Sequence, residues 1–321
     1  MTEPRRFRFG TYSFQTTHAD VLAEAGKAEA LGYEIFQMAD HMFELLGPIP
    51  ALMMIADSYP RLRIGTGVLC NEFRHPVVMS KDAATLDVLS GGRLELGLGA
   101  GYYLAEFEMT GIAFDRGSVR FERLAETVQI TKRAFDGKTF SFEGSHYQVR
   151  DYTPYPVPVQ RPRPPLMLGG GGRRLLSLAA AEADIVSIVP ASLAGGYGRA
   201  TGFKLQSAKN KVALVRKAAG DRWADLEINI LIFGGQVTTD RKGAAAEYAS
   251  QLTERHSEFV LDGEITADDL LESPYFAFGT EHEITEHLLR IREEIGASYF
   301  SVFPHLVESF GPVVGRLAGT T

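Results

Sequence analysis

The sequence predicts an α/β protein built as one (β/α)8 barrel, a TIM barrel, for three reasons. Apolar strand patterns alternate with amphipathic helix patterns along almost the whole chain. The 321 residues suit one large barrel with insertions, and 45% of them are apolar, which is enough for a full core. The first strand–helix unit also lacks the glycine fingerprint of a dinucleotide-binding sheet. We therefore expect a single domain over residues 1–321.

Four strand–helix units are predicted in the first half of the chain. Alternating apolar residues mark the strands, and apolar residues spaced three to four apart mark the helices. Gly32 and Gly91-Gly92 follow two of the helices and act as end signals. The expected strands cover residues 7–12, 33–38, 61–68 and 93–98, and the expected helices cover 20–31, 48–59, 76–89 and 119–135.

An insertion separates the two halves of the predicted barrel. Residues 138–150 alternate around a central Glu-Gly-Ser and predict a β-hairpin after the helix at 119–135, and a proline-rich connector follows at 154–158. Residues 190–204 are predicted to form a mobile loop after the sixth strand, and residues 257–278 to be irregular. The remaining strands are expected at 165–168, 184–188, 226–233 and 299–303, with helices opening after Gly172 and at 205–220, 241–256 and 281–295.

Composition argues against several classes of function. A net charge of −7 and the lack of a basic tract disfavour nucleic acid or an anionic membrane surface as a partner. There is no window of about 18 uncharged apolar residues, and no signal-peptide pattern follows Arg5-Arg6. Cys70 is the only cysteine, which suits a reducing compartment, and no histidine or cysteine spacing fits a metal site. We expect a cytoplasmic protein without a membrane span or a bound metal.

The stretch Gly91–Gly111 is the most informative for function. A predicted strand runs directly into Gly99-Ala100-Gly101, and two tyrosines and the acidic patch Glu106-Phe107-Glu108 follow. Glycines at a strand end let a ligand approach the backbone, and the carboxyl ends of barrel strands are where chemistry takes place. Tyr102 and its neighbour Tyr103 either wall a substrate cavity or belong to the core.

Two further strand ends carry candidate functional residues. Asp40-His41 follows the second strand, where a histidine can transfer a proton near neutral pH and the aspartate can orient it. The alternative is an aspartate that caps a helix beside a surface histidine. The segment Gly65–Val68 ends the third strand, and its glycines indicate either a backbone bulge against a ring or close strand packing.

Three other features complete the candidates. Gly169–Gly172 and Arg173 lie between a strand and a helix start, where free N–H groups suit a phosphate, and the alternative is a flexible loop. Arg74 is expected to bind an anion or to pair with an acid on a neighbouring subunit. The single tryptophan, Trp223, is interpreted as a packing residue.

Taken together, these segments resemble the luciferase-like oxidoreductase superfamily over about residues 7–304. The segments are FGTYS, ALGYEIFQMADH, the run from RIGTGVLCNEFRHP to EFEMTG, PPLMLGGGGRR and the AFGTEHEITEHLLRI region. Within the superfamily, the Asp-His pair, FRHP and GGGGRR resemble the branch that depends on the deazaflavin coenzyme F420.

The resemblance implies a (β/α)8 barrel that binds its coenzyme at the carboxyl end and often dimerises. It implies that Asp40 touches the ring system, that His41 relays a proton and that Tyr102 is a second candidate for this role. It also implies a non-prolyl cis peptide between Gly67 and Val68 behind the ring. The remaining implied coenzyme contacts are Ala100 and Gly101, with Gly170, Gly171, Gly172 and Arg173 at the phosphate.

The function implied is reduction of a C=C, C=N or C=O bond in a small organic substrate by hydride transfer from F420. Two alternatives stay open, a monooxygenase that uses flavin mononucleotide (FMN) and a non-catalytic flavin-binding protein. The sugar-phosphate dehydrogenases of the superfamily carry a catalytic glutamate where this chain has Tyr102, and their tryptophan after the Asp-His pair is missing from residues 42–45. These departures argue against sugar-phosphate oxidation.

Overall fold

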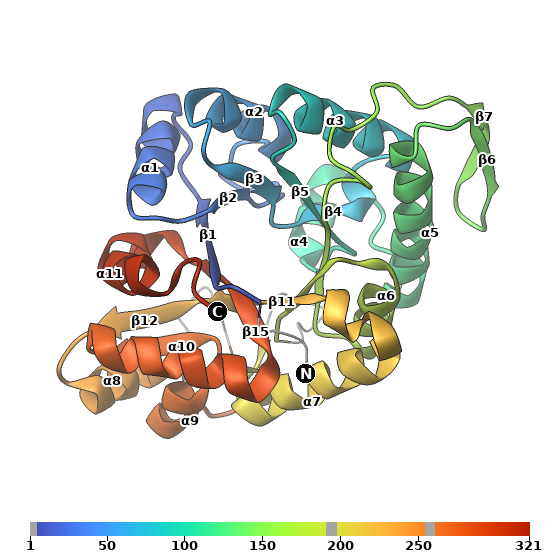
Figure 1. Cartoon of the computed structure of the whole chain (residues 1–321). Coiled ribbons are helices and arrows are strands. Elements are labelled where there is room, and N and C mark those ends of the chain that lie inside the picture. The colour runs from blue at the N-terminus through green and yellow to red at the C-terminus, as the bar shows by residue number, and fades with distance from the viewer. Residues whose placement is uncertain (1–4, 191–197, 254–260) are drawn as a thin grey trace.

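The computed structural model describes residues 5–190, 198–253 and 261–321, and its main sheet is a closed barrel of parallel strands (Figure 1). The ring closes because β3 pairs with β5 and β1 pairs with β15. The predicted fold class is therefore confirmed. In order around the ring, the eight strands are β1 (Arg8–Ser13), β2 (Ile35–Met38), β3 (Arg63–Thr66), β5 (Leu94–Gly99), β8 (Leu166–Gly170), β9 (Ile185–Ile188), β11 (Glu227–Ile232) and β15 (Ala297–Val302).

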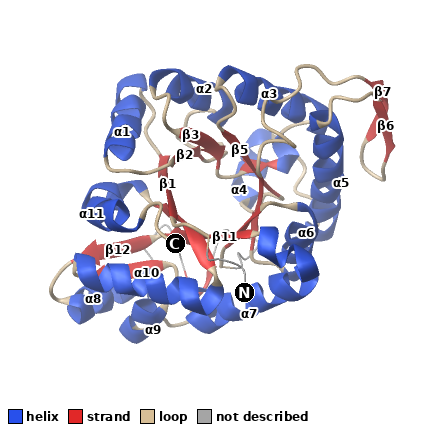
Figure 2. Cartoon of the chain, viewed as in Figure 1, coloured by secondary structure: helices blue, strands red, loops and turns tan. Residues whose placement is uncertain are grey.

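Helices form an outer layer around these strands (Figure 2). Local signals set their ends: Pro48 and Pro76 occupy first helical turns, and Thr280 begins a helix with a capping box that Gly296 ends in a left-handed conformation. The outer helices are α1 (His18–Ala30), α2 (Pro48–Ser58), α3 (Pro76–Leu89), α5 (Gly117–Phe135), α6 (Arg173–Glu182), α7 (Leu205–Ala219), α8 (Arg241–Thr253), α10 (Glu281–Ile295) and α11 (Val307–Leu317). Of these helices, α11 was not predicted. None of the described helices is long and apolar enough to cross a membrane.

The predicted hairpin is confirmed as β6 (Phe140–Glu143) and β7 (Gln148–Tyr152), which project from the barrel beside α5 (Figure 1). The carboxylate of Glu126 on α5 fixes the turn between β6 and β7. It accepts hydrogen bonds from the backbone N–H groups of Ser145 at 2.7 Å and Tyr147 at 2.9 Å.

The third strand and the two predicted loops differ from expectation. The predicted strand 61–68 is interrupted, because β3 ends at Thr66 and β4 (Leu69–Cys70) resumes the pairing with β5. Residues 191–197 of the predicted mobile loop lie outside the described residues, but the rest of that loop forms β10 (Gly198–Arg199) and a 3-10 turn at Ala200–Phe203 that buries Phe203.

The prediction that residues 257–278 are irregular was wrong for its described part. A capping box between Thr266 and Asp269 begins α9 (Ala267–Glu272), and β14 (Phe276–Gly279) pairs with β12 (Gly234–Val237). A short β13 (Leu261–Asp262) pairs with β10. Residues 257–260, like residues 254–256 of the predicted helix 241–256, lie outside the described residues.

Side chains fill the interior of the barrel. Ser187 donates to Asn229 at 2.7 Å, Asn229 donates to Ser301 at 3.0 Å, and Ser301 donates to Gln37 at 2.9 Å, so one buried hydrogen-bonded chain crosses four strands. The barrel is thus a packed core rather than a channel, and a ligand site has to lie at one of its two ends.

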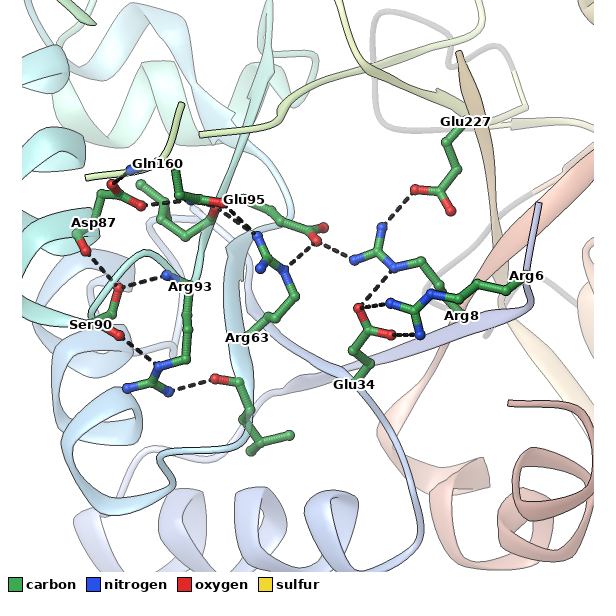
Figure 3. Close-up of polar contacts among 12 residues, drawn as sticks. Arg6, Arg8, Glu34, Arg63, Asp87, Ser90, Arg93, Glu95, Gln160 and Glu227 are labelled. Atoms are coloured by element: carbon green, nitrogen blue, oxygen red, sulfur yellow. Dashed lines mark hydrogen bonds and ion pairs between the residues drawn. The ribbon is translucent and has the colours of Figure 1, made fainter. Parts of the chain in front are cut away.

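An ion-pair network closes the amino end of the barrel (Figure 3). Arg8 pairs with Glu95, with Glu227 at 2.6 Å and with Glu34 at 3.0 Å, while Arg63 contacts Glu95 at 2.9 Å. Desolvation opposes the charge of Arg8, but the surrounding carboxylates outweigh it and raise the pKa of this guanidinium. The network joins the beginnings of four strands, a position associated with stability, and this leaves the carboxyl end for chemistry.

Candidate active site

A histidine and a buried glutamate meet at the carboxyl end of the barrel. His41 lies in the loop after β2, and Glu106 lies on α4 (Leu104–Thr110), a helix that follows β5. Imidazole Nδ1 is 2.9 Å from Oε1 and 3.0 Å from Oε2 of Glu106, which also accepts the backbone N–H of Met42 at 2.6 Å. Because a carboxylate accepts hydrogen bonds, the neutral ring carries its proton on Nδ1. Nε2 makes no hydrogen bond among the described residues.

Aromatic rings surround His41. Phe43 stacks on the imidazole at 4.6 Å between centroids, and Tyr102 meets it edge-on at 6.0 Å. Partial burial, followed by the negative charge of Glu106, raises the pKa of Tyr102, so its phenol stays protonated near neutrality. The structure therefore brings the two predicted proton donors, His41 and Tyr102, to one place.

Asp40 is held within the chain by Arg74. The Arg74 guanidinium binds both carboxylate oxygens at 2.5 and 2.9 Å, and the backbone N–H of Cys70 donates to Oδ2 at 2.9 Å. Arg74 therefore has an acidic partner within the chain, Asp40, and its pairing with a neighbouring subunit or a separate anion stays a prediction. Burial raises the pKa of the Cys70 thiol to about 12, so this cysteine is not a nucleophile at neutral pH.

The wall between β3 and β5 combines a cis peptide with close packing. The peptide between Gly67 and Val68 is cis, as predicted. A Cβ atom on Gly67 would lie 2.4 Å from the Tyr12 ring, and Cβ atoms on Gly97 and Gly99 would lie 2.9 and 2.8 Å from the Val68 side chain. Close strand packing, one of the two interpretations of this segment, is therefore confirmed.

Gly101 and Ala100 follow β5 directly. Gly101 has a φ of +73°, and a Cβ atom there would approach the Cys70 sulfur to 2.8 Å and the Phe107 ring to 2.9 Å. The left-handed backbone and the close packing together account for this glycine. Contact of Ala100 and Gly101 with a coenzyme stays a prediction.

The loop from Gly170 to Gly172 suits the phosphate of a flavin-type coenzyme. Gly172 begins α6 without a capping side chain, and a Cβ atom there would meet open space. Arg173 is exposed and has no hydrogen bond or ion pair among the described residues, whereas Arg174 lies over the Phe121 ring at 4.3 Å. A phosphate is bound by hydrogen-bond donors of this kind, free backbone N–H groups at a helix start and a guanidinium without another partner.

Comparison with known proteins assigns the chain to a family. The sequence pattern of the luciferase-like monooxygenase family matches residues 6–299. The chain belongs to this family. As the sequence predicted, it is thus a member of an oxidoreductase family whose named relatives include F420-dependent and flavin-dependent enzymes.

Three similar proteins illustrate this range. The chain is 32% identical to an F420-dependent glucose-6-phosphate dehydrogenase of Microbacterium testaceum, over 57% of this chain and 56% of that protein. It is 32% identical to the FMNH(2)-dependent dimethylsulfone monooxygenase of Pseudomonas putida, over 34% of this chain and 30% of the relative. The F420-dependent tetrahydromethanopterin reductase of Methanopyrus kandleri has the same luciferase-like fold, with a TM-score of 0.76 and 17% identity over 98% of this chain and 99% of that chain.

The curated relatives match in part only. The chain spans about half the length of the relatives it matches, with 56%, 52% and 48% of three of them covered. The alignments therefore support the family and its class of chemistry, while reaction, cofactor and substrate are matters for the proposal below.

Sequence reasoning missed Glu106 as the partner of His41. The acidic patch was recognised, but nothing in it separates Glu106, which is buried, from the exposed Glu108. The available signal was the spacing of Glu106 and Phe107 three and four residues after Tyr103, which on a short helix turns both inward.

Proposed function

We propose that this protein is a coenzyme F420-dependent oxidoreductase that reduces a C=C, C=N or C=O bond of a small organic substrate. The observation that carries the proposal is the His41–Glu106 pair at the carboxyl end of the barrel. The uncapped start of α6 beside Arg173 supports a coenzyme phosphate at the same end.

Reduction of such a bond consumes a hydride and a proton. When bound, the reduced deazaflavin supplies the hydride. His41 is placed to supply the proton from Nε2 of its doubly protonated ring, because Glu106 holds Nδ1–H and thereby orients the ring. Tyr102, protonated near neutrality and adjacent to the imidazole, is the second proton donor to test.

Aromatic side chains support an apolar substrate. Phe43 and Tyr102 are about half exposed beside His41, and after the neighbouring strands β1 and β15 Phe14 meets Phe303 edge-on at 5.5 Å. Exposed rings at a strand-end site offer apolar and stacking contacts, which suit a neutral organic molecule better than a sugar phosphate.

The runner-up is an FMN-dependent monooxygenase, which the dimethylsulfone monooxygenase relative supports. FMN also has a tricyclic ring and a phosphate, so the loop at Gly170–Gly172 serves either cofactor. The F420-dependent relative aligns over a longer part of the chain, 57% against 34%, and this favours F420.

Titrating the protein with F420 and with FMN tests the choice. We expect tighter binding of F420, measured by its fluorescence, and oxidation of reduced F420 in the presence of an unsaturated or carbonyl substrate. Tighter binding of FMN together with oxygen consumption would replace the proposal with the monooxygenase. Cofactor binding without turnover across a broad substrate panel would leave a flavin-binding protein.

Domain organisation and assembly belong to the same proposal. We propose that residues 1–321 act as one domain and that the protein forms a homodimer, the assembly that resemblance to the family implies. Light scattering coupled to size-exclusion chromatography tests the dimer, with the mass of a single chain as the contradicting result.

A further inference from the structure

A cavity lies at the end of the barrel opposite the candidate active site. It has a volume of about 470 Å³ and lies between α7, α10 and the amino ends of β11 and β15. Figure 1 shows α7 and α10 side by side at this edge of the molecule. Small-molecule sites typically occupy about 300–1,000 Å³, so the volume suits a ligand larger than a single inorganic ion. The cavity is lined by Arg5, Arg216, Trp223, Ala224, Leu226, Leu289, Arg292, Glu293, Gly296, Ser298 and Thr321.

The lining carries more positive than negative charge although the chain as a whole carries −7. Among the described residues, the cavity is lined by three arginines, by one acidic side chain, that of Glu293, and by Thr321 with its terminal carboxylate. None of the three arginines has an ion pair among the described residues: Arg216 lies over the Trp223 ring at 4.5 Å, and Arg292 over the Phe7 ring at 4.5 Å. Arg5 donates only to a backbone carbonyl, that of Ala224, at 3.2 Å.

The acidic residues at the amino end of the barrel already form ion pairs. Glu34, Glu95 and Glu227 point at Arg6, Arg8 and Arg63 in the network of Figure 3. They are therefore engaged in the network, although Glu227 also interacts electrostatically with Arg5, and none of the three forms an ion pair with Arg216 or Arg292 in the described part of the chain. Guanidinium groups without carboxylate partners, close to a low-dielectric wall, attract an anion and bind a phosphate or carboxylate through paired hydrogen bonds.

Two further features of the lining point to a ligand. Ser298 is one of the lining residues, it is 2% exposed, and its buried hydroxyl has no hydrogen-bond partner among the residues that the structure describes. A buried hydroxyl without a partner loses free energy that a ligand acceptor would restore. The half-buried Trp223, together with Leu226 and Leu289, adds an apolar wall suited to a flat group.

We propose that this cavity binds a small anion whose phosphate or carboxylate contacts Arg216 and Arg292 and whose flat apolar part lies against Trp223. The site is separate from the coenzyme site, since its residues precede β11 and β15 whereas Gly170 and His41 follow β8 and β2. It is independent of the cofactor identity proposed above.

Trp223 is the only tryptophan in the chain, so its fluorescence reports on this cavity alone. The full-length protein is titrated with adenosine monophosphate and with benzoate, exciting the tryptophan where neither probe absorbs. Neutral adenosine and benzamide serve as controls for the anionic group. We expect at least one anionic probe to change the fluorescence saturably, and its neutral counterpart to bind at least about tenfold more weakly.

Charge-removing variants locate the binding. Arg216→Gln and Arg292→Gln should each weaken binding of the anionic probe that responds by about tenfold. This loss is equivalent to one charge-assisted hydrogen bond. Lys217→Gln removes an equal charge from the next, exposed position of α7, which does not line the cavity, and should change binding less than twofold. Calorimetric titration repeats the measurement without the fluorophore.

If neither anionic probe gives a binding signal by fluorescence or by calorimetry, the proposal is wrong. Equal weakening by Lys217→Gln would also overturn it, since that result indicates general attraction to a positive surface. Thermal unfolding of each variant shows whether the fold is intact. A variant that fails to fold is replaced by Arg292→Lys, which keeps the positive charge but lacks the planar guanidinium. This variant should weaken binding about threefold or more.

Discussion

Glu106 holds His41 from the loop side of β5, two strands along the ring from β2, with Nδ1 of the imidazole within 3.0 Å of both carboxylate oxygens. The two residues follow different strands, β2 and β5, so the pair links the two loops that carry the aromatic rings. The same carboxylate accepts the backbone N–H of Met42 and thereby fixes the loop as well as the ring. Glu106 is on this basis a positioning residue for His41.

Replacing Glu106 with glutamine should lower kcat about tenfold or more and change KM little. The amide keeps the volume of the carboxylate but has an N–H donor as well as an acceptor, so it no longer restricts the proton to Nδ1 or fixes one orientation of the ring. Steady-state kinetics give the rates, and nitrogen NMR of the histidine ring gives the tautomer. Glu108→Gln, an exposed change two residues away on the same helix, is the control and should leave both unchanged.

Replacing His41 with alanine should slow turnover far more than it weakens cofactor binding. A positioned general acid typically contributes about 10²–10⁴-fold to the rate, whereas loss of a ground-state contact alone would raise the dissociation constant. Stopped-flow oxidation of the reduced cofactor and fluorescence titration separate the two effects on one protein. A rate within about threefold of the parent would transfer the proton-donor role to Tyr102.

Arg74→Gln should destabilise the fold by about 3 kcal/mol. The Asp40 side chain is 2% exposed, and removing the guanidinium leaves a buried carboxylate with a single backbone donor. Urea denaturation followed by circular dichroism measures the change. Arg173→Gln removes an exposed and unpaired guanidinium and should stay within about 0.5 kcal/mol of the parent. Equal stability of the two variants would show that the Asp40–Arg74 pair contributes nothing.

The barrel was predictable because its signals are local. The helix predicted at 76–89 has the observed bounds of α3, since a proline opens it and glycines follow its end. Elements that depend on tertiary contacts were missed. The seven-residue α4 is anchored by the contacts of Glu106, and β12 and β14 form only by pairing with each other across a distant stretch of chain.

The candidate site was predictable where it coincides with strand ends. Asp40, His41 and Tyr102 were singled out because catalytic residues of barrels follow strands at the carboxyl end, and their roles stay predictions. Their partners could not be found in this way. Arg74 and Glu106 are charged residues in loops or short helices, and only the folded chain shows that each faces a particular neighbour rather than water.

Replacing Gly171 with leucine should weaken coenzyme binding at least about tenfold. The residue lies between β8 and the uncapped start of α6, where a large side chain would occupy the space of a phosphate. Fluorescence titration measures the dissociation constant. Gly315→Leu places the same side chain on an exposed position of α11 with no atom near its Cβ, and it should bind the coenzyme normally. Unchanged affinity in Gly171→Leu would relocate the phosphate.

The buried His287 on α10 should make the fold sensitive to acid. Its Nε2 lies 3.0 Å from the Ser273 carbonyl, and its Nδ1 lies 3.1 Å from the Arg290 guanidinium, so the neutral ring donates through one nitrogen and accepts through the other. Burial, followed by the charge of Arg290, lowers the pKa of His287 from 6.5 to about 4. Between these two values the unfolded chain binds a proton that the folded protein does not. Stability is therefore fully present above about pH 6.5 and falls as the pH decreases toward 4.

His287→Gln should remove this part of the acid sensitivity. Glutamine can still donate to the Ser273 carbonyl but does not titrate, so the variant should lose about 3 kcal/mol less than the parent between pH 7 and pH 4. Urea denaturation at both pH values measures the free energies of unfolding. His18→Gln, at the exposed start of α1, is the matched control and should behave like the parent. If His287→Gln loses as much stability in acid as the parent, titration of His287 does not cause the loss. The fold would then not require the neutral form of this histidine.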